Sequence, residues 1–174
     1  LALGTPTSYS SVSSGSHTLV VEPSNSSTAS ISESITLNSA TNYTLITANY
    51  AANLTPILLT DDKSSPSSGD FKLRVVNAAV EAGSVDVYIQ SPGTTDPATG
   101  SVTPTVSGLG LASSSAYQSL AAGSWNIIVT PAGYPVVHYI NTGSLSFSAG
   151  QNRTLVIVPN GNGGITSVTL SDLN

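Results

Sequence analysis

YQSLAAGSWNIIVTP, residues 117–131, decides the fold, because a variant of it, YSSVSSGSHTLVVEP, stands at residues 9–23. Residues 1–23 align with residues 109–131 at a constant offset of 108 and without a gap, and eight of the 23 pairs are identical. The correspondence resumes at residues 42–45 with 152–155, and it closes with Thr60-Asp61 on Ser171-Asp172. A repeat of this length indicates two structural units of one design.

The periodicity of the repeat is that of β-strands. Trp125, Ile127 and Val129 share one face while Asn126 lies on the other, and the same alternation runs through residues 85–89. After residue 120 the strand ends in an Ala-Ala-Gly turn, where Gly123 tolerates a positive φ. Short apolar segments separated by Gly, Pro, Asn and Ser favour an all-β sandwich. The expected strands are residues 71–79, 84–91, 103–111, 115–120, 124–130, 135–141, 144–147, 153–159 and 165–171.

Composition excludes several classes of function. Of the 174 residues 39% are apolar and only 7% are charged, which favours a folded chain over a disordered one. The net charge is −5 with four cations, too few for a nucleic-acid interface. No apolar run approaches the roughly 18 residues of a membrane span, so we expect no membrane insertion. The absence of Cys excludes disulfides and thiol chemistry. Hydroxyl-rich, cysteine-free composition favours an extracellular or cell-surface location, and we expect the chain either to begin after processing or to be a fragment.

The Ser- and Pro-rich residues 63–70 divide the chain. We expect an incomplete β-sandwich module at residues 1–62, a linker at 63–70 and a complete module at 71–174. The second module has 38 residues, 71–108, ahead of the point where the repeat begins, and the first has no counterpart of them.

The second module opens with FKLRVVNAA at residues 71–79 and SVDVYI at residues 84–89, and it continues with SLAAG at 119–123 and VTPAG at 129–133. These segments resemble the family of domains of unknown function numbered 4397 across residues 71–174, and residues 1–62 resemble the latter part of another copy. The resemblance implies tandem immunoglobulin-like modules of exported prokaryotic proteins. The family carries no established activity, so it implies no catalytic residues.

Side chains with reactive or metal-binding chemistry are sparse. His17 and His138 are the two histidines, and neither stands in a His/Asp/Glu pattern with ligand spacing. We expect Asp61-Asp62 and Asp172 to cap or link their modules, although a Ca²⁺ site built with main-chain oxygens is the alternative. Asp86 is expected to make a polar contact across the sheet. We therefore expect no enzyme activity, no cofactor and no metal.

A glycan or protein partner is the alternative function. Tyrosines on the strands, with the loop at residues 92–102, can form a carbohydrate platform, although strand tyrosines more often pack within a sheet. The tyrosines considered are Tyr88, Tyr117, Tyr134 and Tyr139. The glycosylation sequons are at Asn25, Asn42, Asn53 and Asn152, and residues 160–164 read as a hairpin turn rather than a phosphate loop.

The missing strands give the sharpest expectation about function. Without counterparts of residues 71–79 and 84–91, the first module should have an open groove and unpaired strand edges. Either those strands lie upstream of Leu1, or a neighbouring subunit donates a strand, which would propagate head to tail into a filament. The donor is expected at residues 165–173 or 103–111, with residues 1–7 a weaker candidate. The residues expected at this assembly surface are Leu1, Leu3, Leu19, Val21, Ile165, Val168 and Leu170.

Taken together, these patterns predict an extracellular structural protein, a homo-oligomer or filament subunit that assembles by donor-strand complementation.

Overall fold

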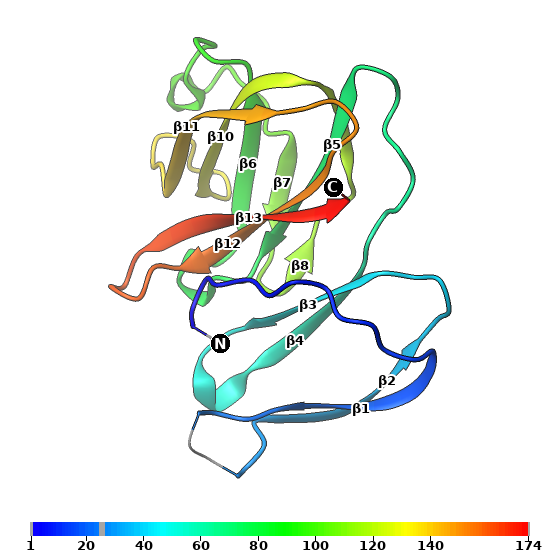
Figure 1. Ribbon diagram of the computed structural model, residues 1–174. Coiled ribbons are helices and arrows are strands. Elements are labelled where there is room, and N and C mark those ends of the chain that lie inside the picture. The colour runs from blue at the N-terminus through cyan, green and yellow to red at the C-terminus, as the bar shows by residue number, and fades with distance from the viewer. Residues whose placement is uncertain (1, 25–26, 174) are drawn as a thin grey trace.

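The computed structural model describes residues 2–24 and 27–173, leaving the side chain of residue 173 aside, and within them the fold is all-β (Figure 1). Thirteen strands are joined by loops and three single 3-10 turns. No helix in this part of the chain is long and apolar enough to cross a membrane.

The C-terminal part is a sandwich of two sheets. One sheet has the order β11-β10-β6-β7, and the other has the order β13-β12-β5-β8, with β9 also pairing β5. The first sheet contains β6 (Val85–Gln90), β7 (Val106–Leu109), β10 (Gly123–Pro131) and β11 (Ile140–Phe147). The second contains β5 (Asp70–Asn77), β8 (Ser113–Ser114), β9 (Gln118–Ala121), β12 (Asn152–Pro159) and β13 (Ile165–Leu173). Alternate apolar residues of both sheets meet in one core, where Phe71 stacks on Phe147 at 4.4 Å between ring centroids.

The N-terminal part consists of two hairpins that repeat half of this sandwich. β1 (Gly15–Val21) pairs with β2 (Ile31–Leu37), and β3 (Tyr43–Ala48) pairs with β4 (Thr55–Thr60). These strands follow the same order as β10 to β13. The register agrees as well, since Thr44 opposite Leu59 corresponds to Thr154 opposite Leu170. The predicted duplication therefore corresponds to equivalent strands.

The two parts pack through equivalent faces. One face of the β3–β4 hairpin lies on the outer face of the sheet formed by β5, β12 and β13, so that the chain forms four stacked layers (Figure 1). Eight residues of the shared apolar cluster are four repeat pairs: Ile46 and Val156, Ala48 and Val158, Ile57 and Val168, Leu59 and Leu170. Contact between the same surface of two equivalent units is the signature of an approximate two-fold axis. Backbone geometry agrees, because Gly4 (φ 68°) and its counterpart Ala112 (φ 59°) share a left-handed conformation.

Three expected strand boundaries were wrong. Residues 135–139 form turns, in which Tyr134 N–H donates to Pro131 and Val137 N–H donates to Tyr134, and β11 begins only at Ile140. The segment at 103–111 is a strand only over β7, and the segment at 115–120 is a strand only from Gln118, where β9 begins. The Ala-Ala-Gly stretch does end a strand, but the chain then changes sheets, since β9 pairs β5 whereas β10 pairs β6.

Candidate functional site

A tyrosine, a threonine and an aspartate form the same hydrogen-bonded cluster in both repeats. Tyr117 Oη donates to Asp172 Oδ2 at 2.8 Å, and Thr154 Oγ1 donates to the same oxygen at 2.6 Å. In the first repeat, Tyr9 Oη donates to Asp61 Oδ2 at 2.6 Å and Thr44 Oγ1 donates to it at 2.9 Å. In each repeat, the tyrosine from the first aligned segment therefore contacts the threonine and the aspartate from the later aligned segments.

Arg74 of β5 joins these two clusters. Its Nη2 donates to Asp61 Oδ1 at 2.7 Å and lies 3.8 Å from Asp172 Oδ2. Its Nε donates to Thr154 Oγ1, its Nη1 donates to the Thr60 carbonyl, and its guanidinium lies 4.7 Å from the centroid of the Tyr117 ring. The side chains of Arg74, Asp61 and Asp172 are all almost completely buried. One buried cation therefore serves two buried carboxylates.

The electrostatics of this cluster are unbalanced at Asp172. Its Oδ1 is buried and has no hydrogen-bond partner among the described residues. Burial raises the pKa of Asp172, and the hydrogen bonds from Thr154 and Tyr117 and the charge of Arg74 offset this only in part. Burial and the bond to Asp61 raise the pKa of Tyr9 to about 12, and burial and the bond to Asp172 raise that of Tyr117 further. Both tyrosines therefore act as neutral donors at physiological pH.

Two strands of the first repeat have an unpaired edge in the described part of the chain. β10 is bordered by β6 and β12 by β5, whereas their counterparts β1 and β3 each belong to a two-stranded sheet. Because Val21 O accepts from Ser30 N, the main-chain groups of Val21 point toward β2, and by alternation those of Thr18 and Val20 point to the open side. Asn42 O likewise accepts from Asp61 N on the β4 side, so Tyr43, Leu45 and Thr47 point outward from β3.

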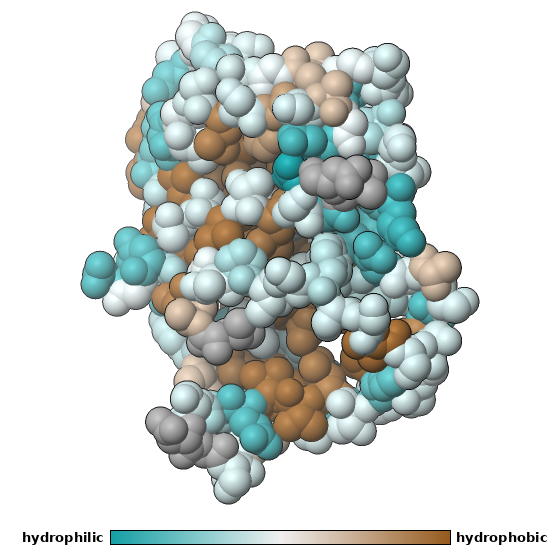
Figure 2. All heavy atoms as spheres, in the orientation of Figure 1, coloured by the Kyte–Doolittle hydropathy of each residue, from teal (hydrophilic) through white to brown (hydrophobic). Residues whose placement is uncertain are grey.

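Missing neighbours also leave apolar side chains uncovered. Leu155 of β12 is 0% exposed, whereas its counterpart Leu45 of β3 is 40% exposed. Leu19 and Val21 are only partly buried, although their counterparts Ile127 and Val129 are fully buried in the sandwich core. Apolar residues are visible between the β1–β2 and β3–β4 hairpins (Figure 2).

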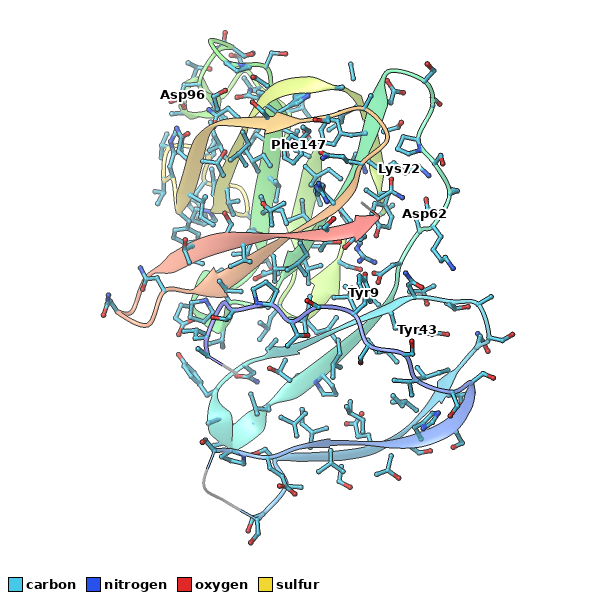
Figure 3. All side chains as sticks on the ribbon, viewed as in Figure 1. Tyr9, Tyr43, Asp62, Lys72, Asp96 and Phe147 are labelled. Carbon is cyan, nitrogen blue, oxygen red and sulfur yellow. The ribbon has the colours of Figure 1, made fainter. Side chains whose placement is uncertain are left out.

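Residues 5–14 also lack the partner strand that their counterparts in the second repeat have. Their counterparts at 113–122 form β8 and β9 because β5 is present to pair with them, for example through Ser115 N–H to Val75 O. No strand is formed by residues 5–14, which run as extended chain past β3 and are held there through Tyr9 (Figure 3).

The segment that follows β4 is fastened to the second repeat. Lys72 Nζ lies 2.6 Å from Asp62 Oδ2, and both residues are labelled in Figure 3. Asn152 Nδ2 donates to the Asp62 carbonyl at 2.6 Å. The hydrogen bonds from Lys72 and Ser64 lower the pKa of Asp62 to about 2. Asp61 and Asp62 thus both anchor the junction between the repeats.

The residues predicted to form the assembly surface do not lie on one surface. Leu1 lies outside the described residues, and Leu3 is exposed, with its side chain near Gly161. Leu19 and Val21 face inward from β1. Val168 and Leu170 pack in the contact between the repeats, and Ile165 packs against the sandwich core. β13 pairs with β12 along its length and β7 pairs with β6, so both strands considered as donors are engaged within the chain.

Other singled-out side chains have structural contacts. The His17 ring Nε2 lies 2.8 Å from Ser13 O, which repeats the bond from Trp125 Nε1 to Ala121 O at 2.9 Å. Asp86 accepts from the Gly108 and Gly133 amides, as a contact across the sheet requires. His138 Nε2 lies 3.1 Å from Asp96 Oδ1 without hydrogen-bond geometry. The described residues contain no group of three or more His, Cys, Asp or Glu arranged to hold a metal ion.

The four tyrosines proposed as a platform differ in exposure. Tyr88 is buried, Tyr117 belongs to the Asp172 cluster, and Tyr134 and Tyr139 are exposed on the turns before β11. Arg74 was not identified from the sequence as a functional residue. Its position could have indicated a role, because cations are rare in this chain and Arg74 lies in the middle of an expected apolar strand.

Two packed sheets around one apolar core define an all-β, β-sandwich protein. The chain belongs to the family described as Domain of unknown function (DUF4397), which matches residues 1–88. This confirms the family expected from the LRVVNA and VDVY segments, although the match covers the first repeat, β5 and the start of β6 rather than residues 71–174. Among solved structures, the chain is similar to the C-terminal domain of AlgF from P. aeruginosa, with 14% identity and a TM-score of 0.41 over 59% of this chain and 98% of that one. No curated protein matches the chain significantly.

Proposed function

We propose that this chain is a structural protein of the cell exterior whose first repeat is completed by strands from a neighbouring molecule, so that linked molecules build a filament. The observation that carries the proposal is the comparison of β1 and β3 with β10 and β12: the same strands have two neighbours in one repeat and one in the other. Strand addition at such an edge forms main-chain hydrogen bonds and gives specificity through pockets for alternate side chains.

The energetic argument follows from the exposed side chains. Burying one aliphatic side chain stabilises by about 1.5–3 kcal/mol, and Leu45, Leu19 and Val21 are all less buried than their counterparts. A complementing strand pair would cover them as β5 and β6 cover the second repeat. The same addition would remove the exposed edges that otherwise favour uncontrolled association.

Composition suits the proposal in two ways. The absence of cysteine is compatible with an exterior location, and a chain with 7% charged residues has few like charges to separate when subunits pack closely. The contact between the repeats, which contains an apolar cluster and a buried ion pair, would hold the two halves of each subunit in fixed orientation along a filament.

The experiment offers the first repeat the strands that it lacks. A synthetic, fluorescently labelled peptide with the sequence of residues 70–91 contains the equivalents of β5 and β6. Anisotropy titration with the full chain should show saturable binding, and the thermal midpoint of the chain should rise with peptide concentration. A scrambled peptide of the same composition is the control. Absence of binding up to about 100 μM peptide, together with an unchanged thermal midpoint, would contradict the proposal.

A monomeric surface module that binds a glycan is the second candidate, because Tyr134 and Tyr139 are exposed on the turns before β11. Glycan-array binding that is lost in the Tyr134→Ala variant, with no binding of the 70–91 peptide, would favour it instead.

A further inference from the structure

Arg74, on β5, has no counterpart across the approximate two-fold relation between the repeats. Arg74 contacts Thr154 and the Tyr117 ring of its own repeat, and Asp61 and the Thr60 carbonyl of the other. The equivalent acceptors on the opposite side of the axis are all present in the chain. They are Thr44, the Tyr9 ring, Asp172 and the Ser171 carbonyl. No cation of the described residues reaches this second set as Arg74 reaches the first.

Asp172 differs from Asp61 in that one of its buried carboxylate oxygens has no partner among the described residues. Asp61 Oδ1 is the oxygen that receives Arg74 Nη2, and Asp172 Oδ1, also buried, has no partner. Asp172 as a residue is 3% exposed. Leaving a buried carboxylate oxygen unpaired is costly, and a guanidinium is the group that pairs with it best in a desolvated site. A second arginine would give two cations for two carboxylates.

The position of the missing arginine along a strand follows from β5. β5 runs parallel to β12, with Arg74 opposite Thr154. In the first repeat, β3 takes the place of β12 and Thr44 that of Thr154. An equivalent strand would therefore run parallel to β3 and place its arginine opposite Thr44, above the Tyr9 ring.

We infer that the strand accepted beside β3 resembles β5, with an arginine that lies opposite Thr44 and binds Asp172 Oδ1. This inference rests on the proposed function and adds the chemistry of the partner: an apolar strand that carries one arginine, in parallel alignment. The two engaged strands considered earlier as donors, residues 165–173 and 103–111, contain no arginine or lysine and do not meet this requirement.

The test compares two peptides on the full chain. The first has the native sequence of residues 70–91, and the second carries Arg74→Gln in that sequence. We expect the native peptide to bind at least about tenfold more tightly, because its guanidinium pairs with a buried carboxylate. Equal binding of the two peptides would overturn the arginine requirement while leaving strand acceptance intact. Binding of neither peptide would overturn both proposals.

Variants of the chain identify the carboxylate. In the Asp172→Asn chain, the preference for the native peptide should fall to about threefold or less, whereas the exposed Asp96→Asn control should retain it. A preference that persists in Asp172→Asn would overturn the assignment to Asp172. If Asp172→Asn does not fold, as judged by circular dichroism, the native peptide with a spin label at its N-terminus is bound to the unmodified chain. Parallel alignment should broaden the amide signal of Tyr43 more than that of Ala48. The reverse pattern would overturn the inference.

Discussion

Arg74 Nη2 lies 2.7 Å from Asp61 Oδ1, and this ion pair joins the two repeats at a point where neither side chain reaches solvent. The two repeats are also joined by an apolar cluster, which includes the four repeat pairs that pack across the approximate two-fold axis. A buried pair of this kind fixes the relative orientation of the two parts, because neither charge can be left without its partner at low cost.

Replacing Arg74 should therefore destabilise the chain strongly. We expect Arg74→Gln to lower the free energy of unfolding by about 3–5 kcal/mol, since it leaves Asp61 buried without a cation. Urea denaturation followed by tryptophan fluorescence measures this. The control is Arg153→Gln, in which the lost partner is the exposed Ser171 hydroxyl, and it should cost less than about 1 kcal/mol. Similar losses for the two variants would contradict the role of Arg74.

The two tyrosines should differ in importance although their contacts are equivalent. Tyr117→Phe removes one of the two hydrogen bonds to Asp172 and should cost about 1.5–3 kcal/mol. Tyr9→Phe should cost less, because Asp61 keeps the bonds from Thr44 and Arg74 and Tyr9 is 51% exposed. Denaturation midpoints of the two single variants test the order, and a larger loss for Tyr9→Phe would contradict it.

The ion pair between Asp62 and Lys72 predicts a dependence on pH. The pKa of Asp62 is lowered from 3.8 to about 2, first by the hydrogen bond from Lys72. Its stabilising contribution is therefore complete above about pH 4 and is lost as the pH falls toward 2. The side chains are 18% and 32% exposed, so we expect only about 0.2–1 kcal/mol. Asp62→Asn should remove this part of the acid dependence, measured as the difference between unfolding free energies at pH 5 and pH 2.5, whereas Glu81→Gln should not.

A proline in β1 should weaken binding of the 70–91 peptide while leaving the stability of the chain nearly unchanged. The main-chain N–H of Thr18 points to the open side of the β1–β2 hairpin, so Thr18→Pro removes no bond to β2 and is tolerated as at other edge strands. We expect about 1 kcal/mol or less of destabilisation with a clear loss of affinity for the 70–91 peptide. Thr18→Ala is the control that should bind normally. Unchanged peptide affinity in Thr18→Pro would exclude the β1 edge as an acceptor.

Much of the strand order follows from the sequence because it depends on local patterns. The alternation in residues 125–129 and the repeat were sufficient to identify β1 as the equivalent of β10, at an offset of 108, and β3 as the equivalent of β12, at an offset of 110. Turns were harder: Val136 and Val137 are strand-forming residues, but Pro135 cannot donate a main-chain hydrogen bond and the segment turns instead.

The packing between the repeats could not be read from the sequence. Val168 and Leu170 have the same alternation whether they face solvent, a donated strand or another part of the chain. Only the three-dimensional arrangement shows that they contact the equivalent face of β3 and β4. The pairing of Arg74 with Asp61 depends on that contact and was not predictable for the same reason. The boundaries at residues 63–70 and the immunoglobulin-like description stay predictions.

Amide hydrogen exchange at β1 and β3 tests the central claim most directly, because the claim concerns individual main-chain groups. In the chain alone, the amides of Thr18, Val20, Tyr43, Leu45 and Thr47 should exchange rapidly, whereas the amides of Leu19, Thr44 and Ile46 should be protected by their partner strands. Saturating 70–91 peptide should slow exchange of the first group at least about tenfold and leave the second group nearly unchanged. Outward amides that are already protected in the chain alone, or that remain unprotected when the peptide is bound, would contradict the account.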